Sequence, residues 1–433
     1  MIAGKKISLI TLGCPKNEAD SDVLAGLLKQ GNPTFVSDPE QADIILINTC
    51  GFIEDAKQES INTILEVGEV KKHNPNARLY VWGCLSQRYK EEIKQEFPEV
   101  DGFFGVEPFE EMGRHFLGNF HWQESCYQNR ILSTPSHTAY LKIADGCNHQ
   151  CTFCAIPTFK GSNHSRSMQS VVDEARMLAD QGARELHLVA QDTTAYGLDL
   201  GPDVRLPALL ESLCRIDGID WIRILYAHPL HVNTALMDVM ASEEKICSYL
   251  DMPLQHASDA MLKAMGRGHG RKDVLRLIDT LRSRIPRLVL RTAFILGFPG
   301  ETDDDYQSLL DLVQTVRFER LGAFLYSAEE GTPAFALKHT VKRDVAIERY
   351  NLLMDMQQTI SEEKNAQYEN QIVQVLVDGF DEDQDCYFGR TSGDALDVDQ
   401  TVWIQGDAHI GQIEKVKIEF SSAYDLEGRV YQP

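Results

Sequence analysis

Three cysteines stand close together near the middle of the chain, at Cys147, Cys151 and Cys154. Their C-x3-C-x2-C spacing puts three thiolates on one short loop. Such a loop can hold three irons of a 4Fe-4S cluster and leave the fourth iron without a protein ligand. An iron with vacant positions can chelate a small molecule, as catalytic zinc sites keep one position open. The spacing therefore predicts a reactive iron–sulfur centre.

Two other interpretations of this loop are weaker. A disulfide with one spare thiol would require an oxidising compartment, which nothing else in the sequence indicates. A zinc site would need a fourth ligand, for which His149 or His164 could be proposed. However, C-x3-C-x2-C is not the C-x2-C spacing that is usual for zinc.

Three further cysteines, Cys14, Cys50 and Cys84, each follow an apolar run typical of a buried parallel strand, at 7–12, 44–48 and 79–82 respectively. Open α/β sheets place their ligands at the carboxyl ends of such strands, so these thiols should meet in space and form a second three-thiolate site. The alternative is three separate buried thiols, because free cysteine packs as a small hydrophobe. The remaining cysteines have no such setting, and we interpret them as core or surface thiols: Cys126, Cys214, Cys247 and Cys386.

The chain has 433 residues, which is too long for one core. Strand-like runs alternate with helical stretches in residues 1–125 and 134–368, which predicts an α/β fold with a parallel N-terminal domain followed by a partial (β/α) barrel. Six strands are expected in that barrel, at 140–143, 184–190, 221–225, 248–252, 288–296 and 323–326. Residues 369–433 change to short strands separated by turn residues, at 372–377, 387–390, 401–404 and 413–420, which predicts a small antiparallel β-barrel.

Charge and hydropathy narrow the class of protein. The formal net charge is −23, which disfavours nonspecific nucleic-acid binding and favours a basic or neutral partner. No run of about eighteen apolar residues predicts a membrane span. The first residues show neither the apolar core nor the cleavage site of a secretion signal, so we expect a cytoplasmic protein.

Four stretches carry a resemblance to a known family: residues 12–17 (LGCPKN), 191–197 (QDTTAYG), 251–258 (DMPLQHAS) and 294–302 (FILGFPGET). Together with both cysteine triads and the three-part order, they are similar to the radical S-adenosylmethionine methylthiotransferases, whose third part is a TRAM domain. The PKN and LQHAS forms most resemble the members that modify ribosomal protein S-twelve. The resemblance implies methylthiolation of the β-carbon of an aspartate in that basic protein, either free or within the small ribosomal subunit.

The same resemblance implies two 4Fe-4S clusters, on Cys147, Cys151 and Cys154 and on Cys14, Cys50 and Cys84. It also implies S-adenosylmethionine as radical source and methyl donor, an external electron donor, and sulfur delivery from the second cluster. Phe153 would contact the adenine. Gln191 and Asp192 are candidates for the methionine or ribose groups, with a solvated turn as the alternative. Arg166 is a candidate for a carboxylate, with a surface salt bridge as the alternative.

Two other functions stay open at this point. The first is a tRNA adenosine methylthiotransferase with the same chemistry, and the second is a noncatalytic iron–sulfur carrier. The composition of the third part weighs against the tRNA enzyme. Residues 371–433 hold thirteen Asp or Glu, among them the acidic run at 381–385, against four Lys or Arg. A net charge of −9 repels phosphates, so RNA binding by this part alone is not expected.

Overall fold

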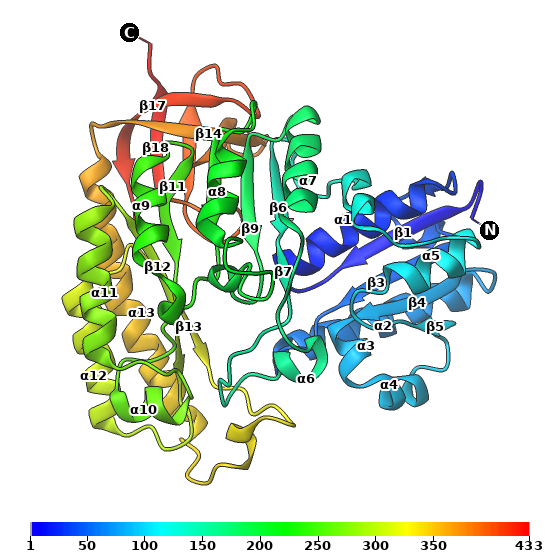
Figure 1. Cartoon of the computed structure of the whole chain (residues 1–433), viewed down its shortest axis with the longest axis horizontal. Helices are drawn as coiled ribbons and strands as arrows, with labels where there is room; N and C mark the ends of the chain where they lie inside the picture. Colours follow the sequence, from blue (N-terminus) through cyan, green and yellow to red (C-terminus); the bar gives the residue numbers. More distant parts are fainter. Residues whose placement is uncertain (1, 433) are drawn as a thin grey trace.

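The computed structural model describes residues 2–432, which form three parts joined in chain order (Figure 1). The first part is a five-stranded parallel sheet with strand order β2-β1-β3-β4-β5. Its strands are β1 (Lys6–Thr11), β2 (Thr34–Phe35), β3 (Ile44–Thr49), β4 (Arg78–Gly83) and β5 (Gly102–Phe103). Its helices are α1 (Pro15–Lys29), α2 (Glu54–His73), α3 (Cys84–Arg88), α4 (Lys90–Glu96) and α5 (Phe109–Leu117).

The central strand β3 shows why this sheet is covered on both faces. Every residue of β3 is buried, and successive side chains point to opposite faces. Leu46 packs with α1 and α5 on one face, whereas Ile45 and Ile47 pack with α2 on the other. Strands that are apolar on both faces belong in parallel sheets with helices on either side.

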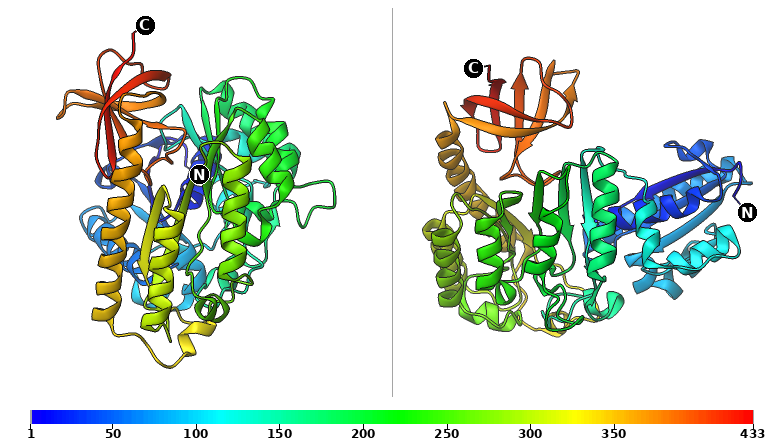
Figure 2. Two further views of the ribbon diagram at one scale, coloured as in Figure 1. Left: turned by 90° about the vertical axis from the view of Figure 1, so that its left-hand side faces the viewer. Right: turned by 45° about the horizontal axis from the view of Figure 1, so that its top comes forward.

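The second part is the predicted partial barrel. Six parallel strands follow one another in the order β6-β9-β10-β11-β12-β13. They are β6 (Thr138–Lys142), β9 (Glu185–Val189), β10 (Trp221–Ile224), β11 (Ile246–Asp251), β12 (Val289–Leu296) and β13 (Arg320–Leu325). The helices cover the outer side (Figure 2). They are α7 (Met168–Asp180), α8 (Leu206–Cys214), α9 (Thr234–Ser242), α10 (Asp259–Ala264), α11 (Arg271–Arg284) and α12 (Asp303–Val316). In residues 2–432 no helix combines the length and apolarity needed to cross a bilayer.

The long helix α13 (Arg343–Asn365) leads to the third part, a closed five-stranded barrel. Its strands are β14 (Ile372–Asp381), β15 (Cys386–Thr391), β16 (Thr401–Gln405), β17 (Ile413–Ser421) and β18 (Asp425–Val430). The predicted barrel is confirmed, but it is not wholly antiparallel. Strand β18, which was not predicted, pairs in parallel with β16, while the other pairings are antiparallel.

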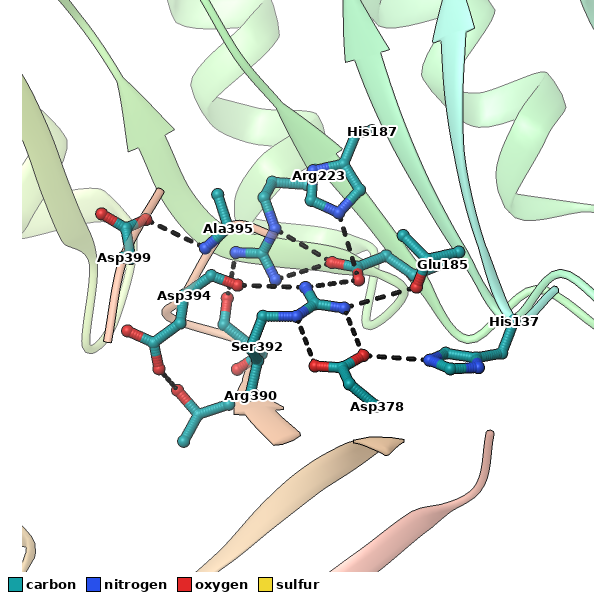
Figure 3. Close-up of polar contacts among 12 residues, drawn as sticks. His137, Glu185, His187, Arg223, Asp378, Arg390, Ser392, Asp394, Ala395 and Asp399 are labelled. Carbon is teal, nitrogen blue, oxygen red and sulfur yellow. Dashed lines mark hydrogen bonds and ion pairs between the residues drawn. The ribbon is translucent and has the colours of Figure 1, made fainter. Parts of the chain in front are cut away.

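A buried polar network fastens the third part to the second (Figure 3). Arg390 of β15 donates hydrogen bonds to Glu185 of β9 at 2.7 Å and to Asp378 of β14 at 2.7 and 2.9 Å. Asp378 also contacts His137 at 2.9 Å, and Arg223 of β10 donates to the Ser392 carbonyl at 2.7 Å. Charges with this many partners are satisfied without water, so the two parts meet in a defined orientation.

Residues 392–400, which connect β15 to β16, lie against the inner face of the central barrel. Tyr249 of β11 donates a hydrogen bond to Asp399 at 2.7 Å. Leu396 belongs to the apolar cluster that includes Tyr140 of β6, Tyr249 and Ala19 of α1. All three parts of the chain therefore contribute to one core in the middle of the molecule.

Candidate functional site

The N-terminal triad, Cys14, Cys50 and Cys84, lies at the carboxyl edge of its sheet, immediately after β1, β3 and β4. The three thiols influence one another electrostatically. Burial raises the pKa of Cys50 to about 11, and Cys14 adds to this shift. Burial likewise raises the pKa of Cys84 to about 12, with further contributions from Cys14 and Cys50. The structure thus brings together the three cysteines that the sequence placed after separate strands.

Two turns hold this triad in place. Gly13 has φ = +93°, and a Cβ at this position would lie 2.6 Å from the Cβ of Cys50, so glycine is needed for both reasons. The buried Asn17 amide donates to the Leu12 carbonyl at 2.8 Å and to the Thr49 carbonyl at 3.2 Å. Asn17 therefore joins the turn before Cys14 to the turn before Cys50.

The central triad, Cys147, Cys151 and Cys154, lies on the loop between β7 (Ala144–Asp145) and α6 (Ile156–Lys160). Burial raises the pKa of Cys154 to about 12 and also raises that of Cys147. The His149 backbone N–H lies 3.5 Å from the Cys147 Sγ, and Arg267 Nη1 lies 3.2 Å from the Cys151 Sγ. Such donors stabilise thiolates, which are the form that binds metal.

The two triads are adjacent. Cys84 shares one apolar cluster with Ala155, which follows Cys154 directly, and with Phe159 of α6. Charged groups also bridge the boundary: Lys160 of α6 pairs with Asp145 at 2.7 Å and with Asp20 of α1 at 3.9 Å. Burial raises the pKa of Asp145, but the charges of Lys160 and Lys142 outweigh it and hold the pKa below its ordinary range.

Each triad fits a cluster with one iron open to another ligand. All six thiols are free, and each set offers three sulfurs. The only imidazole within the central loop, His149, is already engaged, because its Nε2 lies 2.6 Å from Asp192 Oδ2. Arg267 beside the central triad and Lys160 beside Cys84 supply positive charge that would offset an anionic cluster.

Asp192 lies at the centre of a group of histidines, of which the sequence singled out only His149. Its Oδ2 contacts His149 Nε2 at 2.6 Å and His231 Nδ1 at 2.7 Å. The ligand atoms of this group lie within 4.8 Å of one another, so the same three side chains could hold a divalent cation. Burial raises the pKa of Asp192, but the two histidine hydrogen bonds outweigh it and lower the pKa. His228 stacks on His149 with ring centroids 3.8 Å apart.

The other predicted residues have mixed outcomes. Phe153 is half-buried against Met261 and Phe298, with no contact that tests a role toward adenine. Gln191 donates to Asp145 at 2.7 Å, and its Oε1 is buried without a partner among residues 2–432, so it is free to accept from a ligand. Neither Gln191 nor the buried Asp192 is a solvated turn residue.

For Arg166 the structure contradicts the alternative of a surface salt bridge, whereas the role toward a ligand carboxylate stays a prediction. Its guanidinium is buried, pairs with Glu174, donates to the Lys142 carbonyl at 2.7 Å, and stacks on Tyr127 at 3.4 Å. The ion pair is therefore not at the surface. Both terminal nitrogens are used within the chain and fasten β6 to α7, while the buried Nε has no partner among residues 2–432.

Comparisons with known proteins agree with this geometry. Residues 6–105 match the uncharacterized protein family UPF0004, residues 141–313 the radical SAM superfamily, and residues 371–430 the TRAM domain. The radical S-adenosylmethionine methyltransferase TsrM of Kitasatospora setae has a similar fold, with a TM-score of 0.55, 14% identity and coverage of 74% of this chain and 73% of that one. The fold and the cysteine loop define a radical S-adenosylmethionine enzyme.

The curated relatives define the family within that class. The ribosomal protein uS12 methylthiotransferase RimO of Clostridioides difficile (strain 630) is 43% identical, over 98% of both chains. The protein of the same name from Aquifex aeolicus (strain VF5) is 45% identical, over 98% of this chain and 97% of that one. The chain belongs to the family of ribosomal protein uS12 methylthiotransferases.

Proposed function

We propose that this protein transfers a methylthio group to the β-carbon of an aspartate in ribosomal protein uS12. The observation that carries the proposal is the adjacency of the two triads, since Cys84 packs against the α6 segment that follows Cys154. A reaction that removes hydrogen from a carbon and then adds sulfur to it needs two reactive centres within reach of one substrate atom. The full-length similarity to uS12 methylthiotransferases supports the same substrate.

The six cysteines divide into two sets with different roles. We assign Cys147, Cys151 and Cys154 to the cluster that binds S-adenosylmethionine, and Cys14, Cys50 and Cys84 to the cluster that supplies sulfur. When bound, these groups supply the hydrogen abstraction, the sulfur and the methyl group, with electrons from an external donor. The chain itself contributes position and charge: Asn17 and Gly13 fix the first triad, and Arg267 supports the thiolates of the second.

The three parts of the chain divide this work. We assign residues 1–125 to the sulfur-donating domain, residues 134–368 to the radical domain and residues 369–433 to substrate docking. The docking role rests on the acidic balance of the third part, which suits a basic ribosomal protein and not an RNA backbone. This substrate would place the protein in the cytoplasm with the ribosome, where uS12 is either free or assembled.

Mass spectrometry of ribosomal proteins and of tRNA nucleosides from cells with and without this gene tests the proposal directly. We expect uS12 to lose the mass of one methylthio group when the gene is deleted, while methylthiolated adenosine in tRNA stays unchanged. Loss of the tRNA modification with intact uS12 would show that the protein is a tRNA enzyme. No change in either substrate would favour the noncatalytic carrier.

A second experiment separates the two centres. Replacing Cys14, Cys50 and Cys84 by Ala should abolish methylthiolation and leave reductive cleavage of S-adenosylmethionine measurable, because that cleavage needs only the open iron of the central triad. Replacing Cys147, Cys151 and Cys154 by Ala should abolish both activities. If the first variant folds and cleaves no S-adenosylmethionine, the assignment of the two sets is wrong.

A further inference from the structure

Lys16 carries a positive charge close to Cys14 of the first triad, and among residues 2–432 it forms no salt bridge. It stands two residues after Cys14, near the start of α1, and α1 packs against β6 of the central barrel (Figure 1). Its ammonium lies 3.7 Å from the centre of the Tyr226 ring and is within electrostatic range of Cys14 and Asp145. In the part of the chain that the structure describes, the ammonium makes no salt bridge, and the side chain is only half-buried.

The two neighbouring lysines, in contrast to Lys16, do form salt bridges. Lys142 pairs with Asp20, and Lys160 pairs with Asp145 at 2.7 Å. These two carboxylates are therefore already matched by two lysines. The Lys16 ammonium contacts the face of the Tyr226 ring and lies within electrostatic range of Cys14 and Asp145, but it pairs directly with neither of them.

The ring is held under the ammonium by strained backbone. Tyr226 follows β10 and has φ = +58°, a left-handed conformation that is uncommon for an aromatic residue. Its backbone N–H donates to Asp251 at 3.2 Å, and its carbonyl accepts from the Thr193 N–H at 3.1 Å. Strain of this kind persists where the surroundings fix it, and it concentrates at functional sites. The pair of Lys16 and Tyr226 is thus an ordered contact between the first and second parts of the chain.

We propose that Lys16 binds the side-chain carboxylate of the aspartate that is modified. This inference rests on the proposed function and adds a residue that recognises the substrate. A partly buried ammonium that forms no salt bridge gains a charge-assisted hydrogen bond when a carboxylate arrives. Lys16 lies close to Cys14 of the first triad and within electrostatic range of Asp145, which stands two residues before Cys147 of the second, so a carboxylate held there brings the adjacent β-carbon toward both centres. The carboxylate also distinguishes aspartate from asparagine, which has the same shape and no charge.

The test compares two forms of uS12, one native and one with the target aspartate replaced by asparagine. Affinities are measured anaerobically with reconstituted full-length protein, for the wild type, for Lys16→Met and for Lys29→Met. Lys29 is the matched control, because it is the last residue of the same helix and is exposed. Iron content and S-adenosylmethionine cleavage are measured for each protein, so that loss of a centre is distinguished from loss of substrate recognition. Lys16→Gln serves as a second variant if Lys16→Met does not fold.

We expect the wild type and Lys29→Met to bind the aspartate form about ten- to one-hundredfold more tightly than the asparagine form, the range for a hydrogen bond to a charged group. In Lys16→Met this preference should fall to about one, with iron content unchanged. A preference that survives in both Lys16 variants, or that is absent from the wild type, overturns the role of Lys16. If the wild type neither binds nor modifies native uS12, the proposed function itself is wrong.

Discussion

Replacing Arg390 by Met tests whether the third part is held to the central barrel by its charges. The Arg390 side chain is 5% exposed and bonds to Glu185 and Asp378, both of which are also buried. Removing one member of a buried ion pair leaves an uncompensated charge and costs about 3–5 kcal/mol. His187, Arg223 and His137 still contact the two carboxylates, so we expect the loss of unfolding free energy to lie near the lower end of that range.

Arg429→Met is the matched control for this experiment. Arg429 lies in the same small barrel, but it is 63% exposed and its nitrogen is 3.8 Å from Glu419. Exposed pairs of this kind contribute at most about 1 kcal/mol. Urea denaturation of both variants and of the wild type, each with reconstituted clusters, gives the two differences in unfolding free energy.

The pH dependence of the Arg390→Met effect provides an independent check. Burial raises the pKa of Glu185, but Arg390, His187 and Arg223 outweigh it, so the pKa lies well below its ordinary value. This carboxylate stabilises the wild type above about pH 4.3, its ordinary pKa, and the contribution is lost as pH falls further. Without Arg390 the carboxyl groups of Glu185 and Asp378 protonate more readily, so the difference in unfolding free energy between variant and wild type should shrink in acid. If Arg390→Met and Arg429→Met lower the unfolding free energy equally at neutral pH, the third part is not held to the central barrel by the charge of Arg390.

Four further outcomes are expected. Anaerobic reconstitution should give about eight irons per chain in the wild type and about four in the variant in which Ala replaces all three cysteines of the central triad. If the intact protein never binds more than about four irons, the cysteines of the N-terminal triad are structural thiols. Gly13→Ala should reduce iron to about half, because its Cβ would collide with Cys50, whereas Gly4→Ala, also at positive φ but with nothing within 4 Å, should keep full iron. Replacing the exposed carboxylates of the 381–385 turn, Glu382, Asp383 and Asp385, by their amides should slow association with uS12 at low salt, and the deficit should shrink as salt rises. Asp381 is kept because its side chain accepts two backbone N–H groups. Association rates that do not change would show that the turn serves solubility alone. Burial raises the pKa of Asp378, but the His137 hydrogen bond and the Arg390 charge outweigh it and lower the pKa. Asp378 should therefore lose its contribution to stability as pH falls below about 3.9, its ordinary pKa, and hydrogen exchange at β14 should report the loss.

The two α/β parts could be predicted from the sequence because their strands are continuous apolar runs. β3 is the clearest example, with all six residues buried. The edge strands β2 and β5 were missed because each has only two residues, too few to show any pattern. β18 was missed because charged residues interrupt it, and its parallel pairing with β16 depends on barrel closure.

Some residues of the candidate site could likewise be predicted from the sequence, and others could not. The six cysteines could be found because their spacing, or their place after a strand, is visible along the chain. Lys16 and Tyr226, or His149 and His231, come from distant segments, and no local pattern connects them. The buried pair of Arg166 with Glu174 could not be predicted, because a basic residue near a motif looks the same in a sequence whether it faces a ligand or a buried carboxylate.

The apolar cluster that joins Ala19, Tyr140 and Leu396 has a consequence for biosynthesis. These residues are made early, midway and near the end of translation, and domains generally fold as they emerge. The first sheet can fold while the chain is still being made. The inner face of the central barrel is completed only when residues 392–400 have left the ribosome. A chain truncated before that segment would expose Tyr249 and its neighbours, so deleting the third part is not a clean test of docking: it also removes part of the core that the other two parts share.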